Sequence, residues 1–178
     1  YVSDQSQQGI DSLDLLPKEG WGRTVKDHWN MGEVDAHLCL KTFFKKGIAD
    51  YKEGRNFPAK PFVSQLSPRL HFGEVSPNQV WHSVRELGND KNIDHFCSEL
   101  GWREFSYSQL YHNPHLPVEN LQAKFDDFPW VENASYLQAW QKGNTGIPMV
   151  DAGMRQLWNT GYMHNRVRMI VGSFLVKN

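Results

Sequence analysis

The segment Gly161–Val171 (GYMHNRVRMIV) gathers a carboxamide, two guanidiniums and a thioether on a short stretch of chain. As a helix it would place Asn165 and Arg168 on one face, because residues three or four apart are neighbours on a helix surface. Arg166 and Met169 would fall on the adjacent face, so the helix could offer one ligand to each face. A third, apolar face would anchor it in a core and comprises Val167, Ile170, Val171 and Phe174. The alternative is a core helix with a solvated basic side.

The segment Phe96–Phe105 (FCSELGWREF) places Glu99, Trp102 and Arg103 on one face of a predicted helix. A carboxylate can accept a hydrogen bond from a nucleobase N–H, and an indole can stack on a base. Gly101 leaves room for a ligand to approach the backbone. The alternative is a surface ion pair between Glu99 and Arg103, with Trp102 in the core.

The loop Val63–Pro68 (VSQLSP) places two hydroxyls and several backbone N–H groups just before a proline. Such a loop can cradle a phosphate, although serines in loops more often only form turns. Other chemistries have no comparable pattern. His112 and His115 flank Pro114, so no helix presents both, and no zinc-protease, G-x-S-x-G, Walker or Rossmann motif occurs in the sequence. We therefore predict no metal site.

The 178 residues fit one domain, and 39 % hydrophobic with 13 % aromatic residues is a globular composition. A net charge of −1 argues against an indiscriminate nucleic-acid binder, but residues 141–178 hold five bases and one acid, which can meet phosphates. No apolar run approaches the ~18 residues of a membrane span, and no signal peptide is visible. The two cysteines, Cys39 and Cys97, lack motif spacing. We predict a cytoplasmic protein without membrane contact and expect it to be monomeric.

The elements that must position these groups are expected to be helices. Apolar residues recur at a helical period, and no sustained alternation indicates a strand, so we predict an all-α fold. Residues 1–30 are polar and predict an interdomain linker, with residues 31–178 as a helical domain. Ser76-Pro77 and Pro148 are helix start signals. The expected helices cover residues 33–51, 77–87, 93–111, 148–160 and 162–176.

The chain begins in the predicted linker and stops directly after an apolar helix. We therefore expect an internal fragment of a longer protein, with a domain that is incomplete on its C-terminal side. Apolar side chains of the last helix, such as Val171 and Phe174, would then be left exposed.

Four segments of the chain resemble the photolyase/cryptochrome family, in the order and at the spacing of its helical FAD-binding domain. They read LSPRLHFGEVSP (66–77), ELGWREF (99–105), WQKGNTGIPMVD (140–151) and the 161–177 run. The similarity covers about residues 33–178. Within the family the chain resembles the class I cyclobutane pyrimidine dimer photolyases, because Glu99 and the Met163–Met169 run favour that branch over the (6-4) enzymes and plant cryptochromes.

The resemblance implies roles for individual residues. Those that would hold FAD are Tyr51, Ser64, Gln65, Leu66, Ser67, Phe96, Arg103, Asn165 and Arg168. Those that would contact the dimer or nearby DNA are Arg55, Glu99, Trp102, Arg103, Arg166 and Met169. Glu99 and Asn165 would act in catalysis, with Trp130 as the surface end of a tryptophan chain that photoreduces the flavin. Phe62-Val63 stand where the family usually has Thr or Gly-Thr, and Gln65 stands where it has Arg or Lys, which lowers the expected affinity for FAD.

The implied activity is the light-driven repair of cyclobutane pyrimidine dimers in DNA by electron transfer from reduced FAD, in the complete protein. A second, antenna chromophore is expected in an N-terminal domain outside this chain. One alternative is a cryptochrome-type blue-light receptor that binds FAD without repair. Another is a helical DNA-binding module without a cofactor, which leaves Asn165, Tyr51 and the serine loop without a role.

Overall fold

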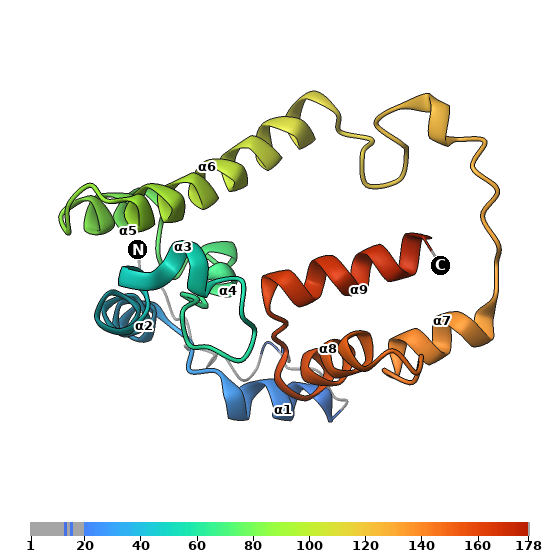
Figure 1. Ribbon diagram of the computed structural model, residues 1–178, viewed down its shortest axis with the longest axis horizontal. Helices are drawn as coiled ribbons and strands as arrows, with labels where there is room; N and C mark the ends of the chain where they lie inside the picture. Colours follow the sequence, from blue (N-terminus) through green and yellow to red (C-terminus); the bar gives the residue numbers. More distant parts are fainter. Residues whose placement is uncertain (1–12, 14, 16–19, 178) are drawn as a thin grey trace, which may run out of the picture.

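The computed structural model describes residues 13, 15 and 20–177, and within them the chain is helical and contains no strand. The predicted all-α fold is confirmed (Figure 1). Short 3-10 helices, η2 (Ile48–Asp50) and η3 (Ala123–Phe125), accompany the α-helices. The α-helices are α1 (Trp21–His28), α2 (Glu33–Lys46), α3 (Tyr51–Gly54), α4 (Ser67–His71), α5 (Pro77–Arg85), α6 (Lys91–His112), α7 (Ala134–Gln141), α8 (Pro148–Thr160) and α9 (Asn165–Lys177).

Local signals in the sequence set the ends of several helices. A capping box opens α5: the Ser76 hydroxyl accepts from the Gln79 N–H at 3.1 Å, and Gln79 Oε1 accepts from the Ser76 N–H at 2.8 Å. The Asp90 carboxylate caps α6 by accepting two backbone N–H groups at 2.7 and 3.0 Å. Helix α6 then runs for 22 residues and ends just before Pro114, which cannot continue it.

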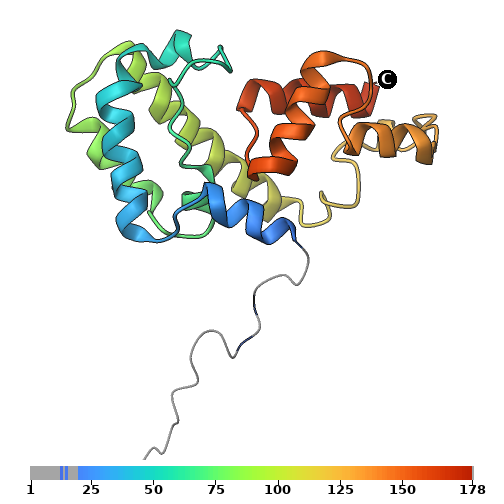
Figure 2. The same cartoon turned by 90° about the horizontal axis from the view of Figure 1, so that it is seen from below.

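Two separate hydrophobic cores organise the described chain. The larger is built mainly from α2, α3, α5 and α6 and comprises Ala36, Leu40, Phe43, Ile48, Tyr51, Leu66, Val75, Val80, Val84, Ile93, Phe96, Cys97 and Leu100. The smaller lies where α8 packs on α9 and comprises Val150, Met154, Met163, Val167 and Val171. Figures 1 and 2 show the helices of the larger core on one side and α8 with α9 on the other. The site residues on α6 and α9 therefore belong to different halves.

Helix α1 packs against α8 and lies beside it in both views. Just past its end, Trp29 Nε1 donates to the Thr160 carbonyl at 2.6 Å. Gly161 ends α8 with φ of 69°, and a Cβ there would lie 3.1 Å from Val25 Cγ2. Residues 1–30 are predicted as a linker, yet this part of them is helical, because Val25 and Trp29 find partners at the end of α8.

Two helix boundaries differ from those predicted. The helix expected over residues 33–51 is interrupted at Gly47, where a Cβ would lie 2.8 Å from the Phe43 ring. The last helix begins at Asn165, three residues later than predicted. The apolar face of α9 is also narrower than predicted, because Ile170 is 43 % exposed whereas Val167 and Val171 are buried. The helical period puts Ile170 on the same side as Val167 and Val171, but it does not show how much of that side the neighbouring helix covers.

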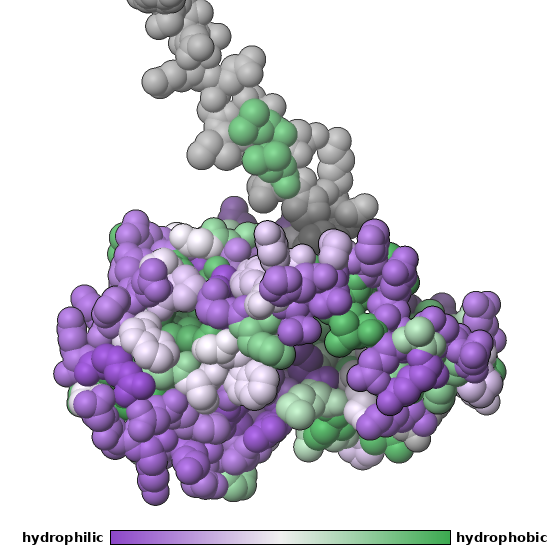
Figure 3. Space-filling model, turned by 90° about the horizontal axis from the view of Figure 1, so that it is seen from above, coloured by the Kyte–Doolittle hydropathy of each residue, from purple (hydrophilic) through white to green (hydrophobic). Residues whose placement is uncertain are grey.

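The face of the molecule in Figure 3 is largely hydrophilic, and apolar residues gather toward its middle. Part of the exposed apolar surface comes from α6, through Trp102, Phe105, Tyr107 and Leu110. Among the described helices, none combines the length and the apolar character that crossing a membrane requires.

Candidate functional site

A cavity of about 700 Å³ lies between α6 and α9. Its lining includes Tyr51, Ser64, Leu66, Ser67, Phe96, Glu99, Trp102, Arg103, Asn165 and Arg168. An adjoining cavity of about 170 Å³ shares several of these residues and adds Arg55, Gln65, Tyr162 and Met163. The larger volume, about 700 Å³, is typical of sites that bind small molecules or cofactors. The three segments whose side chains could carry chemistry thus meet at one cavity, which α6 and α9 both border.

Helix α9 presents its first turn to the cavity. The side chains of Asn165 and Arg168 are exposed, and both line the cavity. Arg168 Nη2 donates to the Met163 carbonyl at 3.2 Å, which steadies the guanidinium beside the cavity wall. Arg168 has no carboxylate partner within the described residues. The cavity therefore has a positive charge and a carboxamide on its α9 side.

The start of α9 is set by His164, which is 3 % exposed. Its carbonyl accepts from the Arg168 N–H at 2.9 Å, and its ring Nδ1 accepts from the Arg166 N–H at 3.2 Å. The imidazole thus fills the place of the usual Ser or Asp cap. Burial lowers the pKa of His164, and the charges of Arg55 and Arg166 lower it further. A neutral ring is the form that can accept this hydrogen bond.

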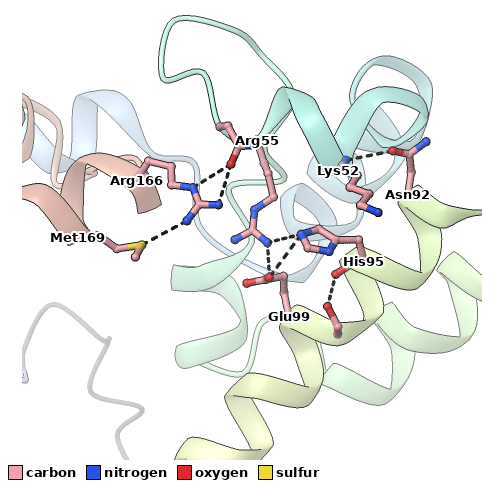
Figure 4. A network of polar contacts seen from close by, with 9 residues as sticks. Lys52, Arg55, Asn92, His95, Glu99, Arg166 and Met169 are labelled. Carbon is pink, nitrogen blue, oxygen red and sulfur yellow. Dashed lines mark hydrogen bonds and ion pairs between the residues drawn. The ribbon is translucent and has the colours of Figure 1, made fainter.

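On the α6 side, Glu99 pairs with a buried arginine. Nη1 of Arg55 contacts Glu99 Oε1 and, at 2.9 Å, His95 Nε2 (Figure 4). The guanidinium carbon lies 5.4 Å from the ring centroid of Tyr51. Arg55 is only 7 % exposed. The resemblance implies that Arg55 contacts nearby DNA, and in this structure Nη1 of its guanidinium is directed at Glu99 and His95.

The floor of the cavity is formed by the larger core. Tyr51 and Phe96 are buried and meet edge to face, with ring centroids 5.1 Å apart. Burial raises the pKa of Tyr51 to about 12, while Arg55 lowers it and Glu99 raises it. Tyr51 is therefore an un-ionised phenol at neutral pH. Both aromatic rings line the cavity as rigid, weakly polar surface.

Further along α6, Trp102 is 61 % exposed and its ring meets Phe105 at 5.6 Å in a T-shaped contact. The alternative that placed Trp102 in the core does not hold in the described chain. Arg103 donates to Glu104 at 2.6 Å and to the Tyr107 hydroxyl at 3.2 Å, rather than to Glu99. An exposed indole one helical turn from a carboxylate is left facing the cavity.

The loop before α4 brings backbone groups to the cavity. Leu66 is 1 % exposed and anchors the loop in the larger core. The Ser64 carbonyl accepts from Cys39 Sγ at 3.2 Å, which ties the loop to α2. Gln65 has φ of 54°, an uncommon conformation for a residue other than glycine. The backbone N–H groups of Gln65 and Ser67 have no partner within the described chain, so they remain able to donate.

Three of the predicted site residues do not line either cavity. Arg166 donates from Nε and Nη2 to Asn56 Oδ1, at 2.9 and 2.7 Å, and from Nη1 to Met169 Sδ at 3.6 Å (Figure 4). Met169 is 57 % exposed. Trp130 is 59 % exposed and packs on Phe128 with ring centroids 4.6 Å apart. The other predicted site residues all line one or both of the two cavities, and these three lie outside them.

Sequence reasoning missed three residues around the site. Of these, His95 could have been found from its place one turn before Glu99, where a helix brings side chains together. Asn56 and His164 carry no such signal, because their partners lie on another element or in the backbone. In the described part of the chain, no three His, Cys, Asp or Glu side chains are grouped so as to hold a metal ion.

Comparisons with known proteins add independent findings. Residues 96–178 match the family model described as the FAD binding domain of DNA photolyase. Over 173 residues the chain is 48 % identical to a deoxyribodipyrimidine photo-lyase of Agrobacterium fabrum, covering 95 % of this chain and 36 % of that protein. Over 159 residues it is 37 % identical to cryptochrome-1 of Arabidopsis thaliana, covering 84 % of this chain and 23 % of that protein.

The fold is similar to that of a bacterial class III photolyase from Agrobacterium tumefaciens, with a TM-score of 0.90 and 46 % identity over 96 % of this chain and 36 % of that one. The chain thus spans about a third of the length of the photolyases it matches. The sequence motifs favour class I, whereas this structural relative is of class III. The chain is thus similar both to photolyases and to a cryptochrome.

Proposed function

This chain belongs to the DNA photolyase/cryptochrome family, and on that premise we propose that the complete protein binds FAD between α6 and α9 and uses light to repair cyclobutane pyrimidine dimers in DNA. The activity would be that of a deoxyribodipyrimidine photo-lyase. One observation carries the proposal: residues suited to a flavin and residues suited to a nucleobase line the same cavity. Dimer-containing DNA would be the partner, and a second, antenna chromophore would complete the protein.

The side chains on α9 and the loop before α4 fit a flavin dinucleotide. The free backbone N–H groups of Gln65 and Ser67 can donate to phosphate oxygens. Arg168 and the carboxamide of Asn165 can donate to the isoalloxazine ring and favour a negative charge on it. Tyr51 offers a buried aromatic ring beside them. Bound there, reduced FAD would supply the light-driven electron that opens the dimer.

The α6 side fits a flipped pyrimidine dimer, which must leave the duplex to reach the cavity. The exposed indole of Trp102 supports stacking on the flipped bases. The Glu99 carboxylate, held by Arg55, can accept from a base N–H. Arg166 and Met169, on the adjacent face of α9, are proposed to contact the DNA next to the dimer. Trp130 is proposed as the surface end of the electron path.

The experiment that tests the function uses the complete protein and a duplex that carries one thymine dimer. We expect purified protein to be yellow, to photoreduce its flavin and to restore intact thymines under blue light. Bound, photoreducible FAD without any loss of dimers would support the cryptochrome-type alternative. Absence of FAD from protein that still binds DNA would support the cofactor-free module and would refute the proposal.

A variant separates stacking from folding. We expect Trp102→Ala to weaken binding of dimer-containing DNA by roughly 5- to 150-fold, because a stacked base contributes about 1–3 kcal/mol. The flavin spectrum and salt-sensitive binding of undamaged duplex should change little. Trp158→Ala is the matched control, since that indole is 71 % exposed and lines neither cavity. Equal losses of affinity on damaged and undamaged DNA would mean that Trp102 is only structural.

A further inference from the structure

We propose that His95 is a positioning residue of the dimer pocket, which orients Glu99 by holding Arg55 in place. Its role in repair rests on the proposed function, whereas the contact itself does not. His95 lies one helical turn before Glu99, and both side chains point toward the Arg55 guanidinium (Figure 4). His95 Nε2 is 2.9 Å from Arg55 Nη1 and 3.9 Å from Glu99 Oε1.

The contacts of Arg55 Nη1 decide which atoms donate and which accept. A guanidinium is always protonated and can only donate, so His95 Nε2 has to be the acceptor. The imidazole is then neutral, with its proton on Nδ1. Arg55 Nη1 carries two hydrogens, and the two acceptors, His95 Nε2 and Glu99 Oε1, use both. With one N–H directed at the histidine, the other is aimed at the carboxylate.

The position of Arg55 is restrained from the α9 side as well. The next residue, Asn56, accepts two hydrogen bonds from Arg166, at 2.9 and 2.7 Å. The turn of Arg55 and Asn56 is thus joined to α6 through His95 and Glu99 and to α9 through Arg166. Because Arg55 is only 7 % exposed, water cannot readily replace a lost acceptor. Removing the imidazole would leave a buried N–H without a partner and let the guanidinium turn away from Glu99.

The consequence concerns the dimer more than the flavin. Glu99 is the carboxylate proposed to accept from a base, and His95 lines neither cavity. In the complete protein, we expect His95→Leu to weaken binding of dimer-containing DNA on the order of 10-fold, as for loss of a hydrogen bond to a charged group. FAD content should not change. His95→Gln should recover much of the affinity, because its amide oxygen can accept from Arg55.

A double-mutant cycle distinguishes positioning from general packing. If His95 acts through Arg55 on Glu99, His95→Leu should cost little further affinity in the Glu99→Gln background. The control is His112→Leu, since His112 is an exposed histidine on the same helix and should be neutral. An equal loss with and without Glu99→Gln would overturn the proposal, as would a His95→Gln variant as weak as His95→Leu.

The contact can also be tested without DNA. In ¹⁵N-histidine-labelled complete protein, we expect His95 to show a protonated Nδ1 and an unprotonated Nε2 at neutral pH. A proton on Nε2 would overturn the proposal whether or not the protein repairs dimers. If wild-type protein neither binds nor repairs dimers, the proposed function fails, and this tautomer still decides whether His95 holds Arg55.

Discussion

The packing of α8 on α9 depends on Gly153. A Cβ built there would lie 2.5 Å from Val167 Cγ1 and 3.0 Å from Val171 Cγ2. A separation of 2.5 Å is far inside van der Waals contact, and both valines are buried in the smaller core. Gly153→Ala therefore has to move α9, which presents Asn165 and Arg168 to the cavity. We expect it to lower both stability and flavin retention.

A second glycine provides the reference. Gly172 lies inside α9, and a Cβ there would meet nothing within 4 Å. Both substitutions gain about 0.5–1 kcal/mol from the better helix propensity of alanine. Only Gly153→Ala adds the overpacking cost, typically about 1–3 kcal/mol. The difference between the two variants in free energy of unfolding should therefore be about 1–3 kcal/mol, with Gly172→Ala the more stable.

The assay is a thermal melt of the complete protein, followed by circular dichroism and by the fluorescence of released flavin. The concentration of FAD is held constant, because a ligand that binds only the folded state raises Tm. At about 2–4 °C per kcal/mol for a domain of this size, Gly153→Ala should melt several degrees below Gly172→Ala. If Gly153→Ala melts as high as Gly172→Ala and retains its flavin equally well, the close approach of α8 and α9 is not as described.

Three further outcomes are expected. Arg168→Ala should lose the flavin or leave it oxidised, because no other guanidinium stands at that side of the cavity in the described chain; unchanged flavin content and photoreduction, measured by absorbance, would count against this role. The hydrogen bond from the Thr145 hydroxyl lowers the pKa of Asp151; burial opposes this effect, and backbone N–H groups add to it. The carboxylate therefore stabilises the fold above its ordinary pKa, and this contribution disappears as pH falls through the lower pKa of the folded state. Asp151→Asn should thus lower Tm at pH 7, with a difference from wild type that shrinks in acid. Burial raises the pKa of Tyr51 to about 12, so the phenol favours the folded state below its ordinary pKa of about 10 and loses that effect as pH rises toward 12. Tyr51→Phe should therefore resist alkaline unfolding better than wild type in that range. An equal alkaline midpoint for the two proteins would contradict the burial of the phenol.

Much of the local structure was predictable, because its causes lie within a few residues. Ser76-Pro77 begins α5, Pro148 begins α8 and Pro114 limits α6, since capping and the missing proline N–H act on the adjacent turn. The period of apolar residues likewise predicted a helix over residues 93–111, which corresponds to α6. The segments that carry the chemical groups, and the family they resemble, could be read in the same way.

The partners of those groups could not be predicted, because they come from distant parts of the chain. Helical spacing offers Arg103 as the partner of Glu99, yet Arg55, 44 residues earlier, takes that place. Periodicity describes which side chains share a face of one helix and contains no information on the element that packs against it. Only the folded chain brings Arg55 beside α6, where it is buried and its Nη1 contacts both Glu99 and His95.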